Sequence, residues 1–110
     1  MRVHFGPAAQ RELNAASSFY DAQRPGLGDE FLDEVQRHMD LLQKNPKLGR
    51  YLFLNRRMLL LNRFPYRLVY AQEESFIRII AVAHMSRRPF YWRHRVEEQR
   101  LPYMILPAAA

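Results

Sequence analysis

The stretch NRFPYRLVYAQEESFIRIIAVAHMSRRPFYWRHR, residues 62–95, decides the fold. Within it, residues 66–72 and 75–83 are rich in β-branched and aromatic side chains, and the polar residues between them are typical of a turn. This pattern predicts a hairpin of two strands. The second strand is apolar at nearly every position except Arg78, as expected of a central strand that is packed on at least one face. A basic and aromatic cluster follows directly after His84.

The N-terminal residues predict a short strand followed by a helix. Residues 2–5, RVHF, alternate ahead of Gly6, and Pro7 suits the first turn of a helix. Apolar residues then recur with helical spacing and predict one buried stripe, which Phe19 widens. The stripe consists of Ala9, Leu13, Ala16 and Tyr20.

A second helix is predicted after the turn QRPGLGD at residues 23–29. Its N-terminal end carries Asp29 and Glu30, whereas its C-terminal end carries Lys44, which suits the helix dipole at both ends. Asn45 and Pro46 end it. The apolar residues at helical spacing are Leu32, Val35, Met39 and Leu42.

Beyond Pro46 the apolar period changes from 3.6 to 2, and further strands are predicted near residues 50–54 and 57–64. The predicted fold is α+β: an N-terminal short strand and a two-helix hairpin packed on one face of an antiparallel β-sheet. A short C-terminal helix starting at Pro89 and an apolar tail complete the chain. On strand 66–72, Tyr66, Leu68 and Tyr70 share one face, and Arg67 lies on the other.

Length and composition favour one soluble domain. The chain has 110 residues and no cysteine, too few residues to divide into two stable cores without disulfides or metal ions. We therefore expect a single domain over 1–110, with 97–110 as its tail. No apolar run approaches the length of about 20 residues that a membrane span requires. These features predict a protein of the reducing cytoplasm with no membrane partner.

Positive charge gathers in one half of the sequence. The net charge is +6, and 11 of the 17 Lys and Arg residues lie within 46–96, together with two of the 11 Asp and Glu residues. Fifteen of the 17 are Arg, which grips carboxylates and phosphates bidentately. A GC-rich genome would also enrich Arg over Lys. It would not explain where the arginines lie, and their position predicts an interaction face.

No pattern of a known catalytic or cofactor site is present. No serine has the spacing of a nucleophile elbow, and no glycine-rich loop could hold a phosphate. The four histidines are not spaced with carboxylates as metal ligands are. The sequence therefore predicts neither a cofactor nor a metal.

The cluster after His84 has three interpretations. Its arginines could grip phosphates while Tyr91 and Trp92 stack on bases, they could bind an acidic peptide, or they could pair internally with Glu97 and Glu98. His84 itself is either a general base or phosphate contact, or a ring that caps the end of the strand. At least one of the three aromatic residues at 90–92 should be buried. The arginines are Arg87, Arg88, Arg93 and Arg95.

The chain resembles the RelE/ParE toxins of type II toxin–antitoxin modules, small basic proteins with a helical hairpin on an antiparallel sheet. The resemblance runs through LGDEF at 27–31, the helix stop at 45–46, RFPYRLVY at 63–70 and IIAVAHMSRRPFYW at 79–92. It implies a toxin that is neutralised by a cognate antitoxin in a hetero-oligomer. One branch of the family cleaves mRNA on the ribosome, and the other poisons DNA gyrase without a recognised nuclease centre.

Carried over residue by residue, the nuclease centre is incomplete in this chain. The two strand lysines of that centre fall at Met58 and Leu60 and its late arginine at Met85, whereas its strand arginine and its tyrosine match Arg67 and Tyr91. Apolar side chains cannot stabilise a developing phosphate charge. The resemblance therefore favours the gyrase branch. A ribosome-dependent mRNA endonuclease, the alternative, would use Arg67, His84, Arg87 and Tyr91.

Two surfaces are implied for the partners. The target-binding residues are Arg63, Arg67, His84, Arg87, Arg88, Tyr91, Trp92 and Arg93. In the tail, LPYMILP either contacts the antitoxin or folds back over its own sheet. The antitoxin-binding residues are Tyr103, Ile105 and Leu106.

Overall fold

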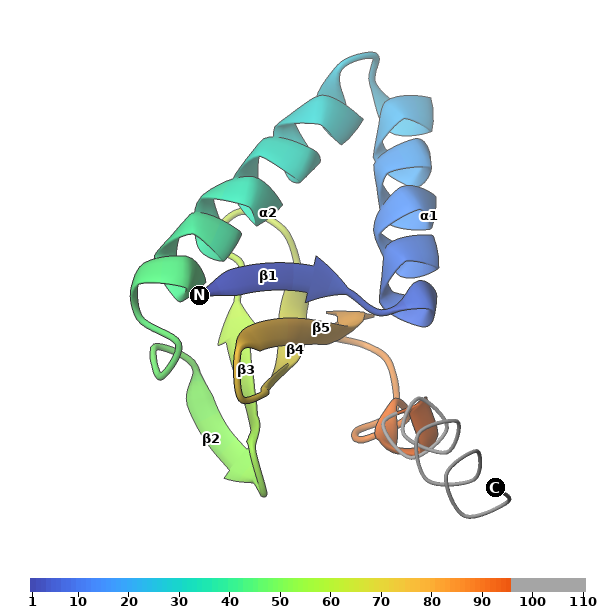
Figure 1. Ribbon diagram of the computed structural model, residues 1–110. Helices are drawn as coiled ribbons and strands as arrows, with labels where there is room; N and C mark the ends of the chain where they lie inside the picture. Colours follow the sequence, from blue (N-terminus) through green and yellow to red (C-terminus); the bar gives the residue numbers. More distant parts are fainter. Residues whose placement is uncertain (96–110) are drawn as a thin grey trace, which may run out of the picture.

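The computed structural model describes residues 1–95, in which a helical hairpin packs on a five-stranded sheet (Figure 1). The predicted α+β class is therefore confirmed. The elements are β1 (Arg2–Phe5), α1 (Pro7–Gln23), α2 (Leu27–Lys44), β2 (Arg50–Phe53), β3 (Arg56–Leu60), β4 (Tyr66–Gln72) and β5 (Phe76–His84). Each predicted helix and strand up to His84 is present, with boundaries that differ from the predictions by a few residues.

The sheet is mixed, although the sequence predicted an antiparallel one. The strand order is β1-β5-β4-β3-β2; the pairs β2–β3, β3–β4 and β4–β5 are antiparallel, and the pair β1–β5 is parallel. A parallel pair needs a long connection between its strands. Both helices and three strands separate β1 from β5 along the chain, so this requirement is met.

The helical hairpin covers one face of the sheet through the predicted apolar stripes. Ala9, Leu13 and Ala16 of α1 and Val35 and Leu42 of α2 are all buried in the same core. The prediction that Phe19 widens the stripe is wrong, because its side chain is 56% exposed. It borders an open groove beside Tyr66 and His84 instead of entering the core.

Strand β3 ends at Leu60, four residues before the predicted end. The reason is a contact with α2. The buried carboxylate of Glu34 accepts hydrogen bonds from the backbone N–H groups of Asn62 and Arg63, at 2.6 and 2.9 Å. These donors are bound to a helix side chain, and residues 61–65 form the connection to β4.

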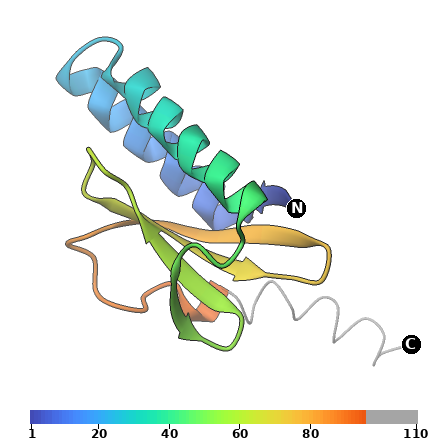
Figure 2. The same cartoon turned by 90° about the vertical axis from the view of Figure 1, so that its left-hand side faces the viewer.

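The other face of the sheet is packed by the residues that follow β5. Figure 2 shows the helices on one side of the sheet and the 85–95 segment on the opposite side. We call this second side the open face. A β-bulge opposite Val69 places Ile80 and Ala81 together on it, and Trp92 packs against them. Tyr66, Leu68 and Tyr70 contribute to the helix-covered core, so their predicted shared face is confirmed.

Candidate functional site

The open face combines apolar side chains with arginines. Met58 of β3 and Val69 of β4 are paired in register, and Arg67 lies two residues from Val69 on the same strand face. The Arg67 guanidinium is half-buried and donates to the Met58 Sδ at 3.6 Å, its one hydrogen bond to the residues 1–95. Arg50 of β2 pairs with Met58 and is exposed. Arg67 is thus a cation without a carboxylate partner in the described chain.

The 85–95 segment is fixed on this face by Trp92. The Trp92 side chain is 4% exposed, and its ring stacks on Phe53 with centroids 6.0 Å apart and planes 6° from parallel. The expectation that at least one aromatic residue of 90–92 is buried is therefore confirmed. Trp92 was also predicted to contact the target, but its ring is not at the surface. Residues 89–92 form turns, and helical structure begins at Arg93 rather than at Pro89.

Phe90 is the aromatic residue of this segment that faces solvent. Its side chain is 42% exposed, and its backbone has φ of 59°, in the left-handed region that is uncommon for residues other than glycine. The Arg93 guanidinium lies 5.7 Å from the centre of its ring. Among the aromatic residues 90–92, Phe90 is therefore the one with an exposed side chain.

Glu12 of α1 connects the helical hairpin to the 85–95 segment. Its carboxylate accepts hydrogen bonds from both terminal nitrogens of Arg95, at 2.7 and 2.8 Å, and from the Tyr91 hydroxyl at 2.7 Å. It also accepts the backbone N–H of Val82 at 2.9 Å. Strand β1 pairs with β5 only as far as Ile79. The N–H of Val82, further along β5, therefore has no partner in β1, and Glu12 accepts its hydrogen bond instead.

These contacts change the pKa values of the groups involved. Burial acts to raise the pKa of Glu12, but the hydrogen bonds from Arg95, Tyr91 and Val82 and the charge of Arg95 outweigh it, and the pKa is lowered. Burial, the hydrogen bond to Glu12 and the negative charge of Glu12 raise the pKa of Tyr91 strongly. The Tyr91 phenol is therefore held neutral and committed to Glu12.

His84 is bound within its own turn. Its Nδ1 accepts the backbone N–H of Ser86 at 3.0 Å and lies 2.8 Å from the Ser86 Oγ. Its ring meets Tyr66 edge-on, with centroids 5.0 Å apart. This is the arrangement expected of the ring that caps the end of β5, one of the two roles considered for it.

Nine of the arginines fall into two groups by their ion-pair partners. Arg24 and Arg63 pair with Glu30, Arg37 approaches Glu34 and Arg95 pairs with Glu12, so these cations are bound to the helices. Arg63, predicted to bind the target, therefore belongs to the helix side. Five other arginines, on the open face and its rim, form no ion pair with a carboxylate of residues 1–95. We call them the arginine surface: Arg50, Arg67, Arg87, Arg88 and Arg93.

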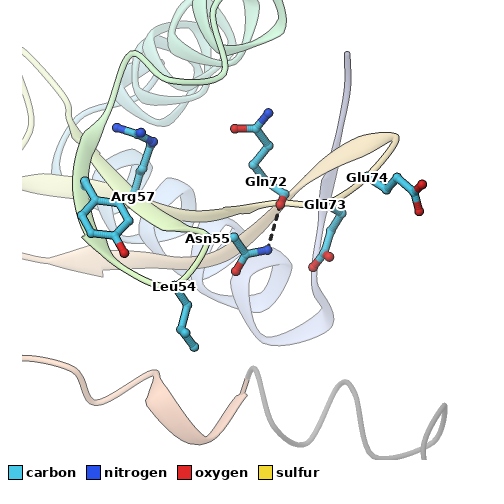
Figure 3. A pocket seen from close by; sticks show the side chains of 7 residues that line it. Leu54, Asn55, Arg57, Gln72, Glu73 and Glu74 are labelled. Carbon is cyan, nitrogen blue, oxygen red and sulfur yellow. Dashed lines mark hydrogen bonds between the residues drawn. The ribbon is translucent and has the colours of Figure 1, made fainter.

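A separate hollow of about 470 Å³ lies between the β2–β3 and β4–β5 turns (Figure 3). Asn55 joins the two turns by donating to the Gln72 carbonyl at 2.8 Å. Glu73 and Glu74 border this hollow, and Arg57 is held by the carbonyl oxygens of Lys47 and Gly49. Because two carboxylates border this hollow and its arginine is bound to the backbone, the hollow is not a continuation of the arginine surface.

Several sequence predictions fall outside the described residues. The antitoxin-binding residues Tyr103, Ile105 and Leu106 and the proposed pairing of arginines with Glu97 and Glu98 lie there. Among residues 1–95, no three His, Asp or Glu side chains gather as metal ligands. Neither helix of this part of the chain has the length and apolar character that a membrane span requires.

The structural roles of Glu12 and Glu34 were not predicted from the sequence. Both positions carry a signal in the helical pattern. Glu12 is three residues after Ala9 and four before Ala16, and Glu34 is three after Phe31, so each carboxylate lies on the buried side of its helix. A charge at such a position needs a partner, and the structure supplies one in both cases.

Comparisons with known proteins agree with this architecture. The family model described as ParE toxin of type II toxin-antitoxin system, parDE, matches residues 3–89. A solved structure described as "Chromosomal ParDE TA system from P. aeruginosa" is similar with a TM-score of 0.68 and 20% sequence identity, over 78% of this chain and 97% of that chain. No curated protein matches the sequence. The structural likeness shows a shared fold, and the family match extends over most of the sequence, so this chain belongs to the ParE toxin family of type II toxin–antitoxin systems.

Proposed function

We propose that this toxin inhibits growth by binding and poisoning DNA gyrase, and that the arginine surface makes the contact. The observation that carries the proposal is the contrast between the two groups of arginines. Arg24, Arg63 and Arg95 are paired with carboxylates of the helices, whereas the arginines of the arginine surface form no ion pair with a carboxylate of residues 1–95. Unpaired guanidinium groups are suited to bind the acidic groups of a macromolecule.

The alternative, mRNA cleavage, lacks support at the positions where it needs charge. Met58, Leu60 and Met85 stand where the nuclease branch has cations, and they cannot stabilise a phosphorane. The Tyr91 hydroxyl donates to Glu12, and its raised pKa opposes loss of the proton. Arg67, the one matching strand cation, is half-buried on the open face and donates to the Met58 Sδ. One cation without an acid or base gives no complete centre.

The proposal includes a cognate antitoxin, a hetero-oligomeric complex and action in the cytoplasm. The family membership implies an antitoxin partner. A second proposal assigns its contact to the tail, at Tyr103, Ile105 and Leu106. We further propose that the whole chain acts as one domain. Neutralisation would then require the antitoxin to block the arginine surface or to hold the tail.

Gyrase inhibition tests the proposal directly. Purified toxin should block supercoiling of relaxed plasmid by gyrase, and Arg88→Ala should raise the concentration needed for half-inhibition by about tenfold, as for loss of an interface anchor. Arg24→Ala is the matched control, because it removes the same charge from an arginine that pairs with Glu30. If the toxin leaves supercoiling intact but stops a cell-free translation reaction, the gyrase proposal is wrong and the protein is an mRNA endonuclease.

A second experiment separates the two functions by residue. Arg67→Ala and Tyr91→Phe are expected to retain some growth inhibition, since neither group performs chemistry in the gyrase proposal. Tyr91→Phe removes only the hydroxyl that Glu12 accepts. Complete loss of toxicity in both variants, with folding preserved by circular dichroism, would support a nuclease centre instead.

A further inference from the structure

Two hollows lie on either side of Phe90. The first, of about 210 Å³, is bordered by Arg50 and Arg67, with Met58 and Val69 as apolar floor and Phe90 and Trp92 as wall. The second, of about 220 Å³, is bordered by Arg88, Arg93 and His94. Both include Pro89 and Phe90. A single exposed aromatic ring therefore separates two cationic recesses.

Neither recess contains a carboxylate among the described residues. Arg50 and Arg88 are exposed, and their guanidinium groups have no hydrogen-bond or ion-pair partner within residues 1–95. Arg67 reaches only the Met58 Sδ, and Arg93 lies over the Phe90 ring. The cations on both sides of Phe90 are thus available to an anionic ligand.

The aromatic residue between them remains in contact with solvent. Phe90 is 42% exposed, while Trp92 two residues later is buried against Phe53. The positive φ of Phe90 holds the chain in a conformation that L residues rarely adopt. The Phe90 ring also packs beside Phe53 and Trp92, with centroids 6.0 and 5.6 Å away, and its exposed part lies between two cationic recesses, where a ligand could stack on it.

We infer that the toxin binds single-stranded nucleic acid here, with one base stacked on Phe90 and the flanking phosphates in the two recesses. A polynucleotide alternates a flat ring with an anion on each side, which is the order of groups around Phe90. An acidic peptide offers carboxylates at every residue but no regular ring. The bound strand is not cleaved, because the Tyr91 hydroxyl is committed to Glu12. This binding does not require gyrase.

Fluorescence anisotropy with labelled oligonucleotides of about 12 residues, oligo(dT) and oligo(U), measures the binding. The logarithm of the association constant should fall with the logarithm of salt concentration by about 0.7 per phosphate contact. Arg88→Ala should reduce this slope by about 0.7, whereas Arg24→Ala should leave it unchanged. Phe90→Leu should weaken binding by about fivefold to a hundredfold with an unchanged slope.

The comparison of the two oligonucleotides identifies the natural ligand, because tighter binding of one assigns the site to DNA or to RNA. Absence of binding to both, or wild-type affinity of Phe90→Leu, overturns the inference. A poly-glutamate peptide of equal charge that competes as well as the oligonucleotide would assign the surface to an acidic protein segment. All three variants are checked for unchanged melting temperature. Gyrase inhibition is measured in parallel without added oligonucleotide, so the two functions can fail separately.

Discussion

At the scale of single residues, Glu12 connects three parts of the fold through its hydrogen bonds. One carboxylate accepts from a strand N–H, a phenol and a guanidinium, which join α1, β5 and the 85–95 segment. Its side chain is 17% exposed, so these hydrogen bonds are only weakly screened by water. The position of the arginine surface therefore depends on a helix residue distant in sequence.

Glu12→Gln should lower the free energy of unfolding by about 2 kcal/mol, because charged hydrogen bonds are lost and the Arg95 charge is left without its partner. Urea unfolding at pH 7 measures the change. Glu74→Gln is the matched control, since Glu74 is exposed. Equal stability of the two variants would show that the Glu12 contacts contribute little.

The same contact makes stability depend on pH. The folded-state pKa of Glu12 lies below the ordinary glutamate value of 4.5, so its stabilising contribution is complete above that pH and is lost as the pH falls through the folded pKa. The difference in unfolding free energy between the wild type and Glu12→Gln should therefore shrink between pH 6 and about pH 3. A constant difference across this range would contradict the assignment.

At the scale of elements, the helical hairpin depends on close approach at Gly28. A Cβ atom at Gly28 would overlap the carbonyl oxygen of Ser17 and lie 2.7 Å from the Asp21 carboxylate, which accepts the Gly28 N–H. The obstructing atoms include backbone of α1, which cannot rotate away. Glycine at the first turn of α2 is thus what allows the two helices to meet.

Gly28→Ala should reduce stability by about 1–3 kcal/mol, the usual cost of forcing extra volume into a packed contact. The variant is compared with Ala22→Ser, a similar increase in size at an exposed position of α1. Thermal unfolding followed by circular dichroism reports both. An unchanged melting temperature for Gly28→Ala would mean that the helices can separate without loss.

At the scale of the whole molecule, the arginines paired with helix carboxylates are distinct from those of the arginine surface. Arg95 sits in a partly buried pair with Glu12, whereas Arg88 and Arg93 are exposed and have no carboxylate partner in residues 1–95. Stability and function should therefore depend on different arginines, even though these three lie within eight residues of sequence.

The double variant Arg88→Gln with Arg93→Gln should change the unfolding free energy by less than about 1 kcal/mol but abolish most gyrase inhibition. Arg95→Gln should instead cost about 2 kcal/mol, because Glu12 is left partly buried and unpaired. Urea unfolding and the supercoiling reaction, run on the same preparations, separate the effects. A clear loss of stability in the double variant would show that Arg88 and Arg93 stabilise the fold, which contradicts this prediction.

Much of the fold follows from local patterns. Apolar spacing placed both helices, and the helix stop at Asn45 and Pro46 is where α2 ends. The β4–β5 hairpin lies within two residues of its predicted position. The end of β3 could not be predicted, because it depends on a hydrogen bond between Asn62 and Glu34 of α2. The exposure of Phe19 could not be predicted either, because it depends on how α1 lies beside Tyr66 and His84.

The sequence by itself determined the elements, the excess of arginine in one half and the family resemblance, because these depend on residue type and spacing. Only the tertiary structure decided which arginines are free. Arg63 and Arg95 are neutralised by carboxylates 33 and 83 residues earlier, and Trp92 is buried while Phe90 is exposed. Charge pairing and burial are set by distances in space, and the folded chain brings together residues that no local pattern relates.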